Sequence, residues 1–192
     1  MPFVGDKIGW RELQARWAYS ELLSHRFISM YSQFAEFTGL FKKARAAVPF
    51  EALNGDETYY LFVMNDLVRS PLVWELKQVP TFVCESWTKE QIGRAFTIHE
   101  GNDGNPIPFE RFAASSPFVV GRGLDPNDAR VAALLIPDYR VIPQKEAVPL
   151  VPVGDGRLKL LDGYLRSLLF WRSSDRDSHL LVWVPLTELP ST

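Results

Sequence analysis

The stretch that decides the fold is Val148–Leu186, VPLVPVGDGRLKLLDGYLRSLLFWRSSDRDSHLLVWVPL. Residues 148–153 are apolar and β-rich, and the alternating polar and apolar residues 157–161 are typical of a half-buried strand. Asp155-Gly156 between them is a strong signal for a tight hairpin turn. Residues 180–184 form another β-rich run. The stretch therefore predicts two strands joined by a hairpin and, further on, a third strand.

A helix is expected to open where the second strand ends, at Asp162-Gly163. Leucines one turn apart predict this helix over residues 164–172. Asp162 can accept backbone N–H bonds as an N-cap, and Gly163 lets a ligand come close to the backbone. A helix N-terminus attracts anions, and Arg166, one turn in, can fork onto a phosphate. Spacing alone favours a simpler interpretation, a strand-to-helix turn with a capping aspartate and a solvated arginine, because capping is common.

The same segment resembles the core of the ParB/sulfiredoxin (ParB-like nuclease) superfamily, over about residues 140–186. That family shows a strand, a DG hairpin, a strand, and a DG-x-x-R turn that opens a helix. The matching residues are Pro149-Leu150-Val151, Asp155-Gly156, Leu160-Leu161-Asp162-Gly163-Tyr164-Leu165-Arg166 and Val182-Trp183-Val184-Pro185. The resemblance implies a turn that binds the phosphates of ATP, ADP or CTP. The phosphate-binding residues that it implies are Asp162, Gly163, Tyr164, Arg166 and Ser167.

This chain departs from the family pattern at two positions of the turn. Leu165 stands where the sulfiredoxin-like and kinase-like members tend to have a histidine, which counts against a fully active kinase-like site. Ser167 stands where the partition proteins carry a second arginine. The turn also has no cysteine, so sulfiredoxin chemistry is not supported.

Composition excludes several classes of protein. The 192 residues are 46% hydrophobic and 23% charged, as expected of a folded chain, and the net charge of −2 gives no global basic footprint for nucleic acid. The single cysteine, Cys84, excludes an internal disulfide and fits a reducing compartment. No apolar run is long enough to span a bilayer, and no signal peptide is evident. We therefore expect a cytoplasmic protein that does not bind membranes.

The N-terminal region is helical in pattern. Aromatic and leucine side chains recur at helical spacing over residues 8–48 and predict two helices or one long kinked helix. This aromatic stripe is expected to be core, and a face for a homodimer or a protein partner is the alternative. The predicted domains are a helical region, 1–50, and a ParB/sulfiredoxin-like domain, 51–192. The fold class is α+β, with a small mixed β-sheet, flanking helices and the helical N-terminal region.

Short-range signals predict further elements between these parts. These are strands at 58–63 and 81–84, a helix at 89–98 capped by Thr88, a loop at 99–108, a helical turn at 109–114 and a helix from 125 to about 135. A GRG sequence at 121–123 is too short to indicate a nucleotide site. The three histidines are far apart, so no metal site made by the protein alone is predicted, whereas Mg²⁺ arriving with a nucleotide fits.

Phosphoryl or nuclease chemistry needs a carboxylate that faces the phosphate. Glu146 is the best candidate catalytic residue, because it directly precedes the strand expected to lie beside the DGYLR turn. Glu100 and Asp103, in the polar loop, come next, and an exposed loop charge is the simpler interpretation of each. Three functions remain open: a nucleotide-binding protein, with or without phosphoryl chemistry, a DNA-binding or DNA-cleaving protein, and a non-catalytic adaptor domain.

Overall fold

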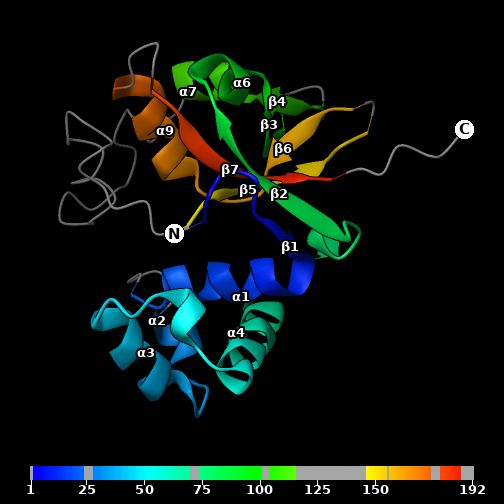
Figure 1. Cartoon of the computed structure of the whole chain (residues 1–192). Helices are drawn as coiled ribbons and strands as arrows, with labels where there is room; N and C mark the ends of the chain where they lie inside the picture. Colours follow the sequence, from blue (N-terminus) through cyan, green and yellow to red (C-terminus); the bar gives the residue numbers. More distant parts are fainter. Residues whose placement is uncertain are drawn as a thin grey trace, which may run out of the picture. The chain divides into compact units, whose positions relative to one another are not determined.

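The computed structural model describes residues 2–23, 28–69, 74–100, 104–115, 146–154, 156–173 and 178–186. These residues form helices and a seven-stranded mixed sheet, so the predicted α+β class is confirmed (Figure 1). The chain divides into two compact units, Met1–Val83 with Pro185–Thr192, and Cys84–Val184. The predicted domain boundary after residue 50 lies inside the first unit. No helix among the described residues is long and apolar enough to cross a membrane.

The first unit is mostly helical. Its elements are β1 (Lys7–Gly9), α1 (Trp10–Glu21), α2 (Ile28–Tyr31), α3 (Phe37–Arg45), the 3-10 helix η1 (Phe50–Ala52), α4 (Gly55–Val68) and the start of β2 (Thr81–Trp87). In Figure 1, α1 lies along one side of α2, α3 and α4. The helical pattern predicted over residues 8–48 is confirmed, but it gives three helices, α1, α2 and α3, instead of two helices or one long kinked helix. Strand β1, which pairs antiparallel with β2 from Lys7 opposite Val83, was not predicted.

Helix α4 corrects the strand predicted at residues 58–63. The β-rich letters TYYLFV lie inside the helix because Asn54 caps its N-terminus. The Asn54 Oδ1 atom accepts from the Glu57 backbone N–H at 2.9 Å, and the Glu57 carboxylate accepts from the Asn54 N–H at 3.1 Å. This reciprocal capping box supplies the start signal that outweighs β propensity.

The aromatic stripe of the N-terminal helices forms a core within the first unit. The buried residues of this core are Ala15, Ala18, Leu22, Tyr31, Leu40, Leu61 and Met64. The Tyr31 hydroxyl donates to Asn65 Oδ1 at 3.1 Å, so its polar end is satisfied inside the core. Phe34 and Phe37 are partly buried against the same cluster. The predicted core role of the stripe is confirmed for these residues.

The second unit carries most of the sheet. Its elements are the rest of β2, α6 (Lys89–Arg94), β3 (Phe96–Glu100), β4 (Pro106–Pro108), α7 (Phe109–Ser115), β5 (Val148–Pro152), β6 (Leu158–Leu160), α9 (Tyr164–Ser173) and β7 (Leu180–Pro185). The spatial order of the strands is β1-β2-β7-β5-β6-β3-β4. The predictions for residues 109–114, 148–153, 157–161, 164–172 and 180–184 are confirmed within one or two residues at each end. Strand β2 extends beyond the predicted residues 81–84.

Helix α6 is shorter than the predicted helix 89–98. Its start is as predicted, since Thr88 and Gln91 form a capping box. It ends at Arg94 because Ala95 is extended, with φ −62° and ψ 147°, and the chain then enters β3. Strand β3 pairs with β4 and β6, so tertiary pairing overrides the helical pattern there. The loop predicted at 99–108 contains the end of β3 and all of β4, whereas 121–123 and 125–135 lie outside the described residues.

The hairpin and the helix that follows it pack around one core. Strand β5 pairs antiparallel with β6 and parallel with β7. The Val153 N–H donates to the Arg157 carbonyl at 3.0 Å, which closes the predicted hairpin. Asp155, at its tip, lies outside the described residues. The buried core residues of the second unit include Trp87, Ile92, Phe109, Val148, Leu150, Leu160, Leu168, Phe170, Leu180 and Val182.

Candidate functional site

The predicted phosphate-binding turn lies between β6 and α9. The Ser167 N–H donates to the Gly163 carbonyl at 2.9 Å, which is the first hydrogen bond of the helix. Gly163, with φ +79°, is therefore the residue whose carbonyl opens the helix. The residue just before α9 is Gly163, one position after Asp162, the predicted N-cap. Asp162 is half-buried and immediately precedes the cap.

Packing explains why glycine occupies this turn. A Cβ atom built on Gly163 would lie 2.8 Å from Val148 Cγ2, and Val148 is buried in β5. Close approach of a neighbouring strand and a positive φ both require glycine. Next to it, the Tyr164 hydroxyl accepts from the Ile98 N–H at 2.6 Å and donates to the Leu160 carbonyl at 2.8 Å. Tyr164 thus ties the turn to β3 and β6.

Glu146 and Arg166 are in contact at the start of β5, and the role of the Glu146 carboxylate at a phosphate stays a prediction. Arg166 Nη1 donates to the backbone carbonyl of Glu146. Glu146 is 7% exposed, and its Oε1 atom accepts from the Ala147 N–H at 3.0 Å and from Trp183 Nε1 at 2.8 Å. Three separate segments therefore converge here: the start of β5, the first turn of α9, and β7.

The role of Trp183 was not predicted, although a signal for it exists. Trp183 is fully buried in β7, and a buried indole N–H needs an acceptor. Its acceptor, the Glu146 carboxylate, lies 37 residues earlier in the chain. The pairing follows from the parallel register of β5 and β7, in which Val148 lies opposite Val182 and Pro149 opposite Trp183. Sequence reasoning identified both strands but not which strands are neighbours.

Ser167, a predicted phosphate-binding residue, does not reach the surface of the turn. It is fully buried, and its hydroxyl has no hydrogen-bond partner among the described residues. On the helix it shares a face with Tyr164 and Trp171, three residues before it and four after it, and both pack against the core. Its hydroxyl therefore faces the core rather than solvent. Of the other predicted carboxylates, Glu100 belongs to β3 by its backbone, and Asp103 lies outside the described residues.

The chemistry of this site follows from its donors and charges. The Glu146 carboxylate is held by two N–H groups, so it is fixed in position. The Arg166 guanidinium is half-buried and attached to the Glu146 carbonyl. The first-turn amides of α9, which is ten residues long, carry the positive end of the helix dipole. The helix amides and the Arg166 guanidinium favour an anion with several acceptor oxygens, whereas the negative charge of the Glu146 carboxylate opposes one.

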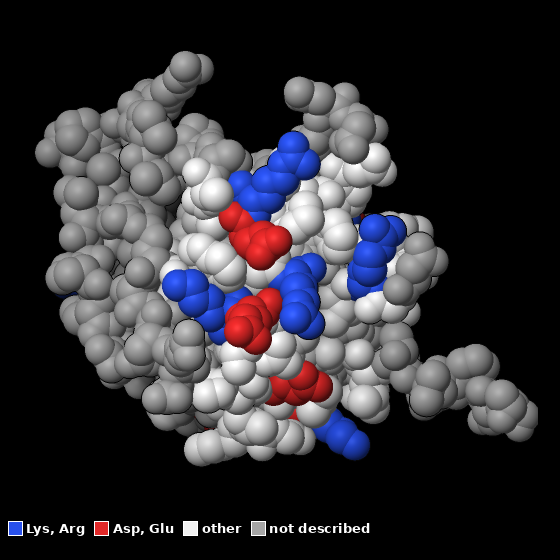
Figure 2. All heavy atoms as spheres, turned by 90° about the horizontal axis from the view of Figure 1, so that it is seen from above, with Lys and Arg blue, Asp and Glu red and all other residues white. Residues whose placement is uncertain are grey.

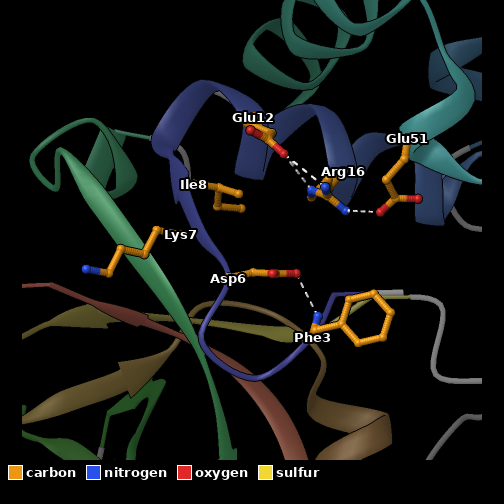
Figure 3. A pocket seen from close by; sticks show the side chains of 7 residues that line it. All are labelled: Phe3, Asp6, Lys7, Ile8, Glu12, Arg16 and Glu51. Atoms are coloured by element: carbon orange, nitrogen blue, oxygen red, sulfur yellow. Dashed lines mark hydrogen bonds and ion pairs between the residues drawn. The ribbon is translucent and has the colours of Figure 1, made fainter.

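A second candidate site is a pocket of about 730 Å³ in the first unit, shown in Figure 3. Its lining residues are Phe3, Asp6, Lys7, Ile8, Glu12, Arg16 and Glu51. Arg16 lies between Glu12 and Glu51 (Figure 3), and its nitrogens are 2.9 Å from Glu12 Oε1 and 2.9 Å from Glu51 Oε1. The guanidinium carbon also lies 4.5 Å from the centre of the Phe50 ring. Arg16 is thus fixed on both sides.

The electrostatics of this pocket fix the charge of Glu51. Partial burial opposes ionisation, but hydrogen bonds from its own backbone N–H and from Arg16, with the Arg16 charge, hold the pKa of the Glu51 carboxyl below its ordinary value. Glu51 is therefore ionised at neutral pH. Sequence reasoning missed this arrangement because Glu51 lies 35 residues from Arg16 and joins it through helix packing. Arg16 and Glu12, in contrast, are four residues apart on α1, which is the usual spacing of an ion pair within one helix.

Comparison with known proteins finds no family model, curated protein or solved structure that matches this chain.

Proposed function

We propose that this protein binds a nucleotide through its phosphates at the β6–α9 turn, in a domain of the ParB/sulfiredoxin type. The observation that carries the proposal is the Arg166 guanidinium, which is anchored beside Glu146 at the N-terminus of α9. A fixed guanidinium loses less conformational entropy on binding than a mobile one. The resemblance of the DGYLR sequence to the phosphate-binding turn of that superfamily supports the same ligand.

The phosphate contacts in this proposal come from the backbone and from one side chain. The amides of the first helical turn point toward the anion, and the helix dipole favours negative charge there. Arg166 carries five N–H donors, so a side chain anchored by one of them can also bind phosphate oxygens. Asp162 adjoins the turn and supplies a carboxylate for a Mg²⁺ ion that arrives with the nucleotide. Ser167 is left out of the contact set because it is buried.

Hydrolysis or phosphoryl transfer is a further step that Glu146 would have to carry. Glu146 contacts Arg166 through its backbone carbonyl, which favours a role in the site, but the two N–H partners of its carboxylate and its burial favour positioning over proton transfer. A Glu146→Gln variant keeps an acceptor for Trp183 and removes the negative charge. If Glu146 is catalytic, the variant binds nucleotide and loses turnover. If the carboxylate is structural only, the variant keeps its nucleotide binding, because Arg166 is held by the Glu146 backbone carbonyl, which the substitution leaves in place.

A thermal-shift screen with ATP, ADP, CTP and GTP, each with Mg²⁺, tests the proposal. A ligand that binds the folded state at about a hundred times its Kd adds about 2.7 kcal/mol. For a chain of this length, that shift corresponds to a rise in Tm of about 5–10 °C. Inorganic triphosphate serves as a phosphate control without a base. No rise with any nucleotide, at concentrations that reach the millimolar range, would reject the proposal.

A DNA-binding function receives less support from the surface. On the described part of the face shown in Figure 2, Lys and Arg side chains are interspersed with Asp and Glu rather than gathered in one basic patch. Duplex DNA binding normally uses several cations that neutralise neighbouring phosphates. A gel-shift titration with duplex DNA, run beside the thermal screen, separates this function from nucleotide binding. A chain that binds neither ligand is best described as an adaptor domain.

A further inference from the structure

A groove of about 370 Å³ lies in the first unit, between α1 and the start of α4. Its walls are aromatic, from Phe50, Tyr59 and Phe62. The hollow exists because two lining residues are small: Ala15 is buried at 2% exposure, and Gly55 has no side chain. The groove therefore has the dimensions and the lining of a socket for one or two apolar side chains.

The side chain of Arg11, which lines this groove, stacks on two aromatic rings. The guanidinium carbon of Arg11 lies 5.2 Å from the Trp10 ring centre and 5.9 Å from the Phe62 ring centre. Arg11 is exposed and makes no ion pair with any residue that the structure describes. Its neighbour Glu12 is paired with Arg16 instead. The charge that the rim offers to a partner is therefore positive.

The aromatic walls extend onto exposed surface. Tyr59 is 62% exposed, and its ring centre is 6.1 Å from that of Phe62, which in turn packs edge-on against Trp10 at 5.5 Å. Tyrosine, tryptophan and arginine are the residues that dominate binding energy in protein interfaces. An aromatic surface that the first unit leaves exposed, next to a stacked arginine, is typical of a protein-binding patch.

We propose that this groove binds a peptide segment of a partner protein, in which an apolar side chain fills the groove and an aspartate or glutamate pairs with Arg11. Charge complementarity selects this occupant, since a single stacked guanidinium matches one carboxylate. A single-stranded nucleic acid would stack on the aromatic rings but would need several cations along its phosphates. This site is independent of the β6–α9 turn.

Substitutions at two glycines test the proposal directly, because one glycine lines the groove and the other does not. A Cβ atom built on Gly55 meets no atom within 4 Å, and neither does one on Gly39 of α3, so both positions accept a side chain without strain. Gly55 lines the groove, so Gly55→Leu adds bulk to its wall, and Gly39→Leu is the matched control on another helix. Arg11→Glu reverses the rim charge, and Arg45→Glu makes the same change on exposed α3 surface. Circular dichroism with a urea melt checks that each variant folds.

The probes are three sets of synthetic peptides that each contain one leucine or tryptophan. The flanking residues are aspartate or glutamate in one set, lysine in another, and serine in the third. Fluorescence anisotropy on the full chain should show binding of the acidic set alone. Gly55→Leu and Arg11→Glu should each weaken that binding by about tenfold or more, the range of a central interface residue. Gly39→Leu and Arg45→Glu should bind as the wild type does.

Several outcomes would overturn the proposal. One is binding of the basic or serine peptides as tightly as the acidic ones, and another is unchanged acidic-peptide binding by Gly55→Leu. Absence of any peptide binding to the wild type rejects it as well. Sedimentation of wild type and Gly55→Leu tests for a second copy of this chain, because self-association lost in the variant would identify that copy as the occupant. Binding of a single-stranded oligonucleotide that both groove variants abolish would identify nucleic acid instead.

Discussion

Replacing Gly163 by alanine tests whether packing against Val148 requires the glycine in addition to its positive φ. The new methyl group would lie 2.8 Å from Val148 Cγ2 and 3.2 Å from Val148 Cγ1. Val148 is 1% exposed and β-branched, so its side chain has few rotamers to which it can retreat. The backbone also holds φ at +79°, where residues with a Cβ are disfavoured. Both effects act against the folded state.

The two costs can be separated. The left-handed conformation costs about 1–2 kcal/mol, and forcing a methyl group into a packed core costs about 1–3 kcal/mol. Gly163→Ala should therefore lower the free energy of unfolding by about 2–5 kcal/mol. Gly156, at φ +69°, has nothing within 4 Å of its Cβ position, so Gly156→Ala carries the conformational cost alone. The difference between the variants measures the overlap with Val148.

Urea denaturation followed by tryptophan fluorescence gives both values. A third variant, Gly163→Ala with Val148→Ala, removes the overlapping methyl groups. In a double-mutant cycle it should recover about 1–2 kcal/mol of coupling energy. The reasoning is refuted if Gly163→Ala costs no more than Gly156→Ala, because the space beside Gly163 would then be open. In that case the glycine would be explained by its positive φ rather than by packing.

Three more predictions concern the first unit. Asn54→Ala removes the capping box of α4 and should cost about 1 kcal/mol in a urea melt, while Asn54→Asp should retain most of it. Arg16→Ala removes two carboxylate contacts and the stack on Phe50, and should lower the free energy of unfolding by about 2–3 kcal/mol. The folded-state pKa of Glu51 lies below its ordinary value of 4.5, so the stability from this ionisation is complete above pH 4.5 and is lost as the pH falls through the folded-state pKa. Urea melts across this range should show a shallower acid loss for Glu51→Gln than for the wild type.

Local rules predicted the C-terminal fold well. The hairpin at residues 153–157, the helix after Gly163 and strand β7 each carry their own signals in turn residues and periodicity. The strand predicted at 58–63 was wrong because β propensity was weighed above the Asn54 and Glu57 capping box. The helix predicted to reach Ile98 was too long because β3 is held by pairing with distant strands. Pairing of that kind leaves little trace in a local pattern.

The candidate site was predictable in part for the same reason. The proximity of Glu146 to the turn followed from the order of strand and turn, and the structure shows the contact with Arg166. The contact of Glu146 with Trp183 depends on β5 and β7 being neighbours, which the sequence does not state. The overlap of Gly163 with Val148 and the burial of Ser167 depend on how α9 packs on the sheet. The burial of Ser167 removes it from the turn residues that can contact a ligand.

Calorimetric titration of the wild type and Arg166 variants with nucleotide and Mg²⁺ tests the central claim most directly. The account predicts saturable binding at one site, weakened by about 1.5–3 kcal/mol in Arg166→Ala, the worth of a hydrogen bond to a charged group. Arg166→Lys should restore part of it, because an ammonium cannot form the fork. Arg94→Ala, an exposed arginine at the end of α6, should bind as the wild type does.

The titrations belong with urea melts, since Arg166→Ala also frees the Glu146 carbonyl and should cost about 1–3 kcal/mol of stability. The titrations are therefore run at a temperature and in a buffer in which the urea melts show each variant to be fully folded. Binding that is lost in Arg166→Ala, partly restored in Arg166→Lys and intact in Arg94→Ala is the predicted result. A wild type that takes up no nucleotide, or an Arg166→Ala variant that is folded and binds as tightly as the wild type, would contradict the phosphate site.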